Sequence, residues 1–193
     1  MDFFEVVKKR RSIRKFSQKK IDLELLVSCV DVARVSPQGG NKQPMKYCII
    51  TEDQLIEDIF PHTKWAGYLY PDYTPQEGEK PTAYIALLVD EEKQTKADVA
   101  AGIVGQSILL TAQAQGLGSC WLGAIERGAI KELLNIPETY QLHSIIALGY
   151  PLEEPKVVDV GEDQSIRYFL DDDGCLNVPK RKMEEVLFIN QVK

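Results

Sequence analysis

The sequence lacks the glycine-rich signatures by which many proteins hold the phosphates of a nucleotide. It contains no GxxxxGK[ST] loop and no GxGxxG stretch between a strand and a helix. The nearest pattern, Gly116-Leu117-Gly118, follows a predicted helix. The chain therefore has neither a P-loop nor the usual dinucleotide-binding turn, and an anionic ligand would have to be held by other groups.

Histidine and cysteine are also scarce. The chain has two histidines and four cysteines, and the cysteines share no close spacing. A structural zinc site needs clustered ligands of these types, so we expect no metal site. The cysteines lie in apolar segments, which predicts buried free thiols in a reducing compartment rather than a disulfide framework. They are Cys29, Cys48, Cys120 and Cys175.

Long apolar runs and targeting signals are missing as well. No run approaches the roughly 18 residues that suggest a membrane span. The start, MDFFEVVKKRR, carries its charges after its apolar residues, unlike a signal peptide. We therefore expect a cytoplasmic protein. Its 193 residues, 44% of them hydrophobic and 27% charged, predict a single globular domain over residues 1–193.

The charge is distributed unevenly along the chain. The net charge is −6, yet the segment Lys8–Lys20 holds eight basic residues and no acidic one. A localised anion site fits this contrast better than general nucleic-acid binding does. The alternative is the solvated face of a surface helix.

Four polar residues follow the first predicted helix, which begins at Asp2 with a capping-box pattern. If the chain leaves this helix in an extended form, alternate side chains project to one side and the residues between them face the core. Arginine pairs bidentately with phosphate, and a serine hydroxyl adds a donor. Arg10, Ser12 and Arg14 could converge on a single anion in this way, Arg11 is a further candidate for ligand binding, and Ile13 and Phe16 are expected to face the core.

The stretch Ala97–Ala124 is predicted to be a long buried helix followed by a short strand, because it has no charged residue between Asp98 and its end. Gly102 and Gly105 are costly inside a helix and suggest the close approach of another backbone. The strand runs into Leu122-Gly123-Ala124, where bare N–H groups could form the floor of a ligand site. Plain core with a tight turn explains this stretch equally well.

Two further segments are candidates for a site. The turn-rich loop Gln38–Pro44 combines glycines, which allow close backbone approach, with the amides of Asn41 and Gln43. The segment His62–Lys80 is rich in aromatics, prolines and polar residues, and we interpret it as an ordered loop or lid. An ordinary connecting loop is the alternative for the first segment.

Periodicity and turn residues predict the remaining elements. The expected helices are 22–35, 52–60 and 126–135, the expected strands are 45–51, 84–89 and 142–148, and a hairpin joins 167–170 to 175–178. The apolar end of the chain, Val186–Ile189, is expected to dock on the body or on a partner subunit.

Five motifs together resemble the nitroreductase family of FMN-dependent oxidoreductases, in the family's order and over nearly the whole chain. They are RRSIRKF at 10–16, SPQGGNKQP at 36–44, GIVGQSILLTAQAQGLGSCWLGA at 102–124, ALGYP at 147–151 and PKRK at 179–182. The resemblance implies an α+β fold with a central mixed β-sheet flanked by helices. It also implies a homodimer with FMN at the subunit interface and a C-terminal segment that wraps the partner.

The resemblance further assigns roles to individual residues. The FMN phosphate would be held by Arg10, Arg11, Ser12 and Arg14 together with Arg181. The loop of the other subunit would line the flavin with Pro37, Gln38, Asn41 and Gln43, and the isoalloxazine would face Leu122, Gly123 and Ala124. The glycines of the long helix would pack at the dimer interface.

The implied reaction is ping-pong. A hydride passes from NAD(P)H to flavin N5, and a nitro compound, quinone or similar small-molecule acceptor then takes its turn on the same flavin face. No side chain is needed as a catalytic acid or base. The alternatives are a flavin-dependent dehydrogenase, a dehalogenase or other flavin chemistry on the same fold, and, more remotely, a non-catalytic phospholigand-binding or nucleic-acid-binding protein.

Overall fold

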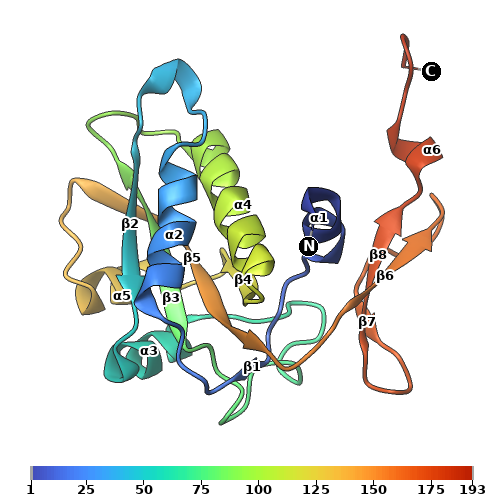
Figure 1. Cartoon of the computed structure of the whole chain (residues 1–193), viewed down its shortest axis with the longest axis horizontal. Coiled ribbons are helices and arrows are strands. Elements are labelled where there is room, and N and C mark those ends of the chain that lie inside the picture. The colour runs from blue at the N-terminus through green and yellow to red at the C-terminus, as the bar shows by residue number, and fades with distance from the viewer. Residues whose placement is uncertain (1, 193) are drawn as a thin grey trace.

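A central antiparallel sheet organises the chain in a computed structural model that describes residues 2–192 (Figure 1). Its longest strand, β5, pairs with β3, with β4 and, near its end, with β1, and β2 extends the sheet beyond β3. The strands are β1 (Phe16–Ser17), β2 (Met45–Ile50), β3 (Ala83–Asp90), β4 (Gly118–Leu122) and β5 (Tyr140–Pro151).

Helices cover both faces of this sheet. The elements are α1 (Phe3–Lys9), α2 (Leu23–Arg34), α3 (Asp53–Ile59), α4 (Asp98–Ala114), α5 (Arg127–Leu133) and α6 (Met183–Val186), with 3-10 turns at Gly39–Asn41 and Phe60–His62. Every residue of β3 is buried, because alternate side chains enter two separate cores. Ile85 and Leu87 pack with residues of α2 and α4, whereas Tyr84 and Ala86 pack with residues of α3 and α5.

The expected α+β class is confirmed, with one refinement of the expected mixed sheet. All named strand pairs of the central sheet are antiparallel. Parallel pairing occurs at the isolated bridge between Ser12 and Ser119 and in a smaller sheet near the C-terminus. The predicted helices and strands are present, with the expected short strand as β4, and β5 is longer at both ends than 142–148.

The smaller sheet contains β6 (Lys156–Val160), β7 (Phe169–Leu170) and β8 (Leu176–Arg181), and it extends to one side of the central sheet (Figure 1, orange to red). The predicted hairpin is confirmed as β7–β8, whereas the parallel strand β6 was not expected. Beyond β8, the apolar side chains of the tail do not dock on the body of their own chain. Met183, Val186, Leu187, Phe188 and Ile189 are all at least half exposed.

The segment expected to be a lid is partly core. Trp65 and Tyr73 are buried, while Tyr68 and Tyr70 are exposed. The indole Nε1 of Trp65 donates to Thr63 Oγ1 at 2.8 Å, so its one polar atom is satisfied inside. The segment is therefore held to the body by two of its own aromatic side chains.

Within residues 2–192, no helix is long and apolar enough to cross a membrane. The same part of the chain contains no group of three or more His, Cys, Asp or Glu side chains arranged to hold a metal ion. The four cysteines are free thiols.

Gly105 of α4 packs against an aromatic ring of the same chain, which leaves no room for a side chain there. A Cβ built on Gly105 would lie 2.1 Å from Trp121 Cζ3, and Trp121 Nε1 donates to Ser144 Oγ at 2.7 Å, which holds the ring there. The expectation that both helix glycines meet a partner subunit is therefore wrong for Gly105. Gly102 is exposed and has no atom of its own chain within 4 Å of that position.

We predict that Gly105→Ala lowers the free energy of unfolding by about 1–3 kcal/mol, because the added methyl group overlaps the indole of Trp121. Denaturant unfolding at fixed protein concentration measures the change. Gly128→Ala in α5 is the matched control, because Gly128 is exposed and the described residues leave open space for its Cβ, and we expect it to be neutral or stabilising by up to about 1 kcal/mol. Equal destabilisation by both substitutions would contradict the Trp121 explanation.

Candidate functional site

The segment between α1 and β1 lies along the edge of the central sheet. Ile13 N donates to Ser119 O at 2.9 Å, and Ser12 forms a parallel bridge with Ser119. Ile13 and Phe16 are buried, as predicted from their alternation with the polar residues. Gly118 makes this approach possible, because a Cβ there would lie 2.9 Å from Ile13 Cγ2.

The opposite side of this segment lines a cavity of about 200 Å³. The structure brings together the four residues predicted for anion binding, and three residues from the C-terminal part of the chain complete the lining. The lining residues are Arg10, Arg11, Ser12, Arg14, Tyr168, Val178 and Lys180. We call this group the basic cavity. Among residues 2–192, no acidic side chain lines it, so it is suited to a small, multiply charged anion.

The electrostatics of the basic cavity favour an anion. Burial lowers the pKa of Arg10, and burial together with the neighbouring charge of Arg10 lowers the pKa of Arg11. Within residues 2–192, the buried Nε of Arg14 has no hydrogen-bond partner, and the guanidinium lies 5.1 Å from the ring centroid of Tyr168. A bound phosphate would stabilise the partly buried like charges and would give the unpaired donor an acceptor.

The structure separates Arg181 from the other predicted phosphate ligands. Its Nη1 donates to Gly161 O and, at 3.1 Å, to Gln164 O. Lys180, the preceding residue of β8, lines the basic cavity instead. Neighbouring residues of a strand point to opposite faces, so only one of the two can point into the cavity. The basic cluster PKRK thus lies partly on β8, and Lys180 is its residue that lines the cavity.

The predicted loop residues lie far from the basic cavity in the same chain. The 3-10 turn Gly39–Asn41 lies at the top of Figure 1, whereas the segment after α1 runs down toward β1. Pro37, Asn41 and Gln43 are exposed, and Gln38 is half-buried with an unpartnered Oε1 among residues 2–192. A single subunit therefore does not join this loop to the arginines.

The end of β4 forms a third part of the predicted site. Leu122 is buried, while Gly123 and Ala124 are exposed, with open space where a Cβ of Gly123 would stand. The backbone here is fixed by bonds to its carbonyl groups. Arg127 Nη2 donates to Gly123 O at 3.1 Å and Lys64 N donates to Ala124 O at 3.0 Å.

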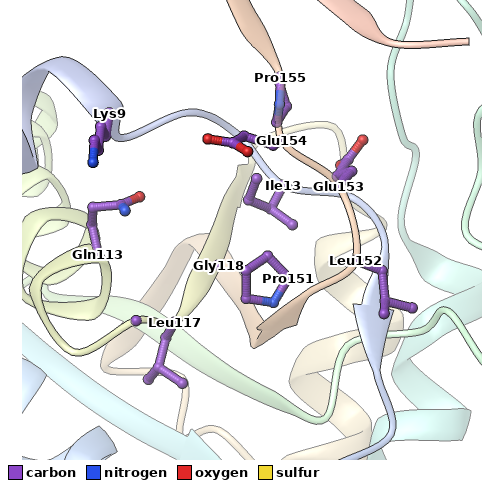
Figure 2. A pocket seen from close by; sticks show the side chains of 11 residues that line it. Lys9, Ile13, Gln113, Leu117, Gly118, Pro151, Leu152, Glu153, Glu154 and Pro155 are labelled. Atoms are coloured by element: carbon purple, nitrogen blue, oxygen red, sulfur yellow. The ribbon is translucent and has the colours of Figure 1, made fainter. Parts of the chain in front are cut away.

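Sequence reasoning missed the contribution of the chain after β5. Tyr168 packs on Tyr68 with ring centroids 4.9 Å apart, so the lining of the basic cavity is continuous with the segment predicted to be a lid. Just beyond β5, residues Leu152–Pro155 form the wall between two larger hollows of about 590 and 640 Å³. Figure 2 shows the first of these, with Lys9 and Gln113 across from Glu154. No local motif singles out these residues.

The sequence is similar to that of known proteins over most of its length. The sequence model of the nitroreductase family matches residues 7–150. A curated relative from Methanothermobacter thermautotrophicus, named "Putative NADH dehydrogenase/NAD(P)H nitroreductase", is 28% identical over 86% of this chain and 86% of its own length. An iodotyrosine deiodinase from Thermotoga neapolitana is 24% identical over 86% of this chain and 96% of its own length.

Solved structures share the fold. An FMN-dependent nitroreductase from Clostridium difficile R20291 aligns with a TM-score of 0.68 at 23% identity, over 98% of this chain and 99% of its own. At that identity the likeness concerns the fold, and it covers the C-terminal sheet as well as the central one.

If the basic cavity holds the phosphate of FMN, Lys180→Ala is predicted to raise the dissociation constant for FMN by about tenfold, because a charge-assisted contact to the phosphate would be lost. Arg181→Ala, the matched control, is expected to change it by less than about twofold, because Arg181 bonds to carbonyl groups outside the cavity. Quenching of flavin fluorescence measures both values. The reverse order would support the assignment of the phosphate contact to Arg181.

Proposed function

Because the chain belongs to the nitroreductase family, we propose that it is an FMN-dependent oxidoreductase that uses NAD(P)H to reduce a small-molecule acceptor such as a nitro compound or a quinone. The observation that carries the proposal is the basic cavity, where four residues of the motif RRSIR converge without an acidic neighbour in the lining. The cytoplasm, where the four free thiols stay reduced, is the proposed location.

In this proposal the basic cavity holds the phosphate of FMN. Arg10, Arg11, Ser12 and Arg14 supply donors from one segment, and β8 supplies Lys180, with Arg181 as the competing assignment. The unpartnered Nε of Arg14 is the group that gains most directly, since it is buried in the absence of any acceptor among residues 2–192.

The flavin ring would lie over the end of β4. Leu122 offers a buried apolar side chain, and Gly123 and Ala124 offer a small, exposed backbone that a planar ring can approach closely. Bound there, FMN supplies hydride transfer to and from its N5 atom, in a ping-pong sequence with NAD(P)H and then the acceptor. The protein residues bind and orient the ring, and none of them has to move a proton.

We further propose a homodimer in which each site is completed by the partner's loop 37–43. Pro37, Gln38, Asn41 and Gln43 are placed away from the basic cavity of their own chain, so a second subunit is the simplest way to bring them to a flavin. Large apolar side chains are exposed on several elements, which is typical of an interface. They include Phe3 and Phe4 of α1, Val99 of α4, and Leu187, Phe188 and Ile189 of the tail.

Reductive dehalogenation is a second candidate reaction. The relative from Thermotoga neapolitana is named an iodotyrosine deiodinase, and the match extends over most of both chains. The same flavin chemistry would serve both reactions, so the acceptor and not the cofactor separates the two candidates. Turnover of iodotyrosine in preference to nitro compounds and quinones would favour the second.

The first test is the absorption spectrum of the purified protein, followed by anaerobic addition of NADH and then NADPH. We expect flavin bands that bleach with at least one of the nucleotides and return when a nitro compound or quinone is added. A flavin that neither nucleotide bleaches would contradict the proposed electron donor. A colourless protein that also fails to bind added FMN would contradict the whole proposal.

We predict that removal of residues 184–193 converts the dimer to monomer, because the apolar tail is exposed on its own chain and would be buried by the partner. Sedimentation equilibrium measures the change in mass. Removal of residues 190–193 alone is the control and is expected to leave the dimer intact. A fully dimeric protein without residues 184–193 would refute the wrapping role of the tail.

A further inference from the structure

One carboxylate ties three separate groups together beside the basic cavity. Glu153 Oε1 accepts from the backbone N–H of Arg14 and from that of Lys15, the latter at 3.3 Å. Glu153 Oε2 accepts from the hydroxyl of Tyr73. Both oxygens of this half-buried side chain are therefore engaged, and two of the three donors belong to the segment that carries the anion-binding residues.

Backbone pairing next to Glu153 determines which residues its side chain contacts. Phe16 and Ser17 pair with Pro151 and Tyr150, and Leu152 N donates to Lys15 O at 2.9 Å. The chain after β5 thus continues beside the chain before β1, and Glu153 is the side chain at the end of this ladder. Its two backbone contacts fix Arg14 immediately before the point at which regular pairing begins.

The position of the Arg14 backbone decides where its guanidinium lies. That group stacks on Tyr168 inside the basic cavity, while its Nη1 reaches Ser12 O at 3.5 Å. Within residues 2–192, no strand pairing includes Arg14 or Lys15, and Glu153 restrains this part of the segment through their backbone N–H groups. A carboxylate that accepts two adjacent N–H groups is a strong restraint, because hydrogen bonds to a charged acceptor are stronger than neutral ones.

Tyr73 extends the restraint to the segment 62–80. Its ring is buried, and Lys15 Nζ lies 5.4 Å from the ring centroid and 3.2 Å from Glu79 Oε1. Burial, and then the hydrogen bond to Glu153, raise the pKa of Tyr73, so its hydroxyl remains a donor at any physiological pH. The carboxylate therefore keeps all three of its donors.

We propose that Glu153 is a positioning residue for the phosphate end of the cofactor: it holds the backbone of Arg14 so that the guanidinium is already directed into the basic cavity. The inference rests on the proposed function, because it takes the phosphate of FMN as the anion. Glu153 is itself negative and would repel a phosphate. Any contribution of Glu153 to phosphate binding must therefore come from the position it gives Arg14. Two conservative substitutions, one that removes the charge and one that shortens the side chain, should then have different effects.

Glu153→Gln keeps the length of the side chain and removes its charge. The amide oxygen can still accept from Arg14 N and Lys15 N, and the amide nitrogen can donate to the oxygen of Tyr73. Glu153→Asp keeps the charge and withdraws the carboxylate by one methylene, so the three contacts cannot all be made. Positioning predicts that Gln is tolerated and Asp is not, whereas a role of the charge itself predicts the opposite.

The neighbouring glutamate provides a matched control. Glu154 is exposed, and in the segment between β5 and β6 its carboxylate points to the other side of the chain from that of Glu153, toward Gln113 (Figure 2). Glu154→Gln changes the net charge by the same amount, one residue along the chain from the side chain that contacts the Arg14 backbone. It is expected to leave binding unchanged.

The experiment compares FMN with riboflavin, which lacks the phosphate, by fluorescence titration of the apoprotein. For Glu153→Asp we expect the dissociation constant for FMN to rise by about tenfold. The value for riboflavin should change by less than about twofold, since the ring site at β4 is untouched. Glu153→Gln should bind FMN within about threefold of the wild type.

Three results would overturn the inference. Glu153→Asp could bind FMN as tightly as the wild type, it could weaken FMN and riboflavin equally, or Glu153→Gln could be the weaker of the two variants. Thermal unfolding of each apoprotein verifies that both variants are folded. A wild-type protein that binds neither flavin would instead overturn the proposed function, and the inference with it.

Discussion

The fold depends on β5 having both of its edges occupied. One edge carries β3 and the other carries β4, and the end of β5 also pairs with β1, so a single strand joins the core sheet to the segment that forms the basic cavity. Close packing between β4 and this segment leaves no room for a side chain at one position. Gly118 has no Cβ, and the space it leaves is filled by Ile13, which brings the arginine segment against the sheet. Stability and the candidate site therefore depend on the same contacts.

The basic cavity shows how an acidic protein can maintain a strongly basic site. Burial lowers the pKa of both Arg10 and Arg11, the charge of Arg10 lowers that of Arg11 further, and that arrangement is costly without an anion. The nearest carboxylate that restrains the segment, Glu153, bonds to backbone N–H groups rather than to the guanidinium groups. The positive side chains thus remain available for a ligand.

Much of the fold could be predicted from local patterns. The fully apolar run of β3, the helix start at Asp2 and Glu5, and the alternation of Ile13 and Phe16 with polar residues each depend on neighbouring residues only, and each is observed. Predictions that depended on distant packing were less accurate. The ring that meets Gly105 belongs to Trp121 of the same chain, and the aromatic segment 62–80 places Trp65 and Tyr73 in the core.

The sequence by itself determined the α+β class, the run of helices and strands, and the basic character of the segment that follows the first helix, because periodicity, capping and charge are local properties. Only the tertiary structure decided which side chains meet that segment. Because neighbouring residues of β8 face opposite sides, Lys180 lines the basic cavity and Arg181 does not. Glu153 contacts Arg14 although 139 residues of chain separate them. Such choices follow from sheet register, which depends on how all strands pack together.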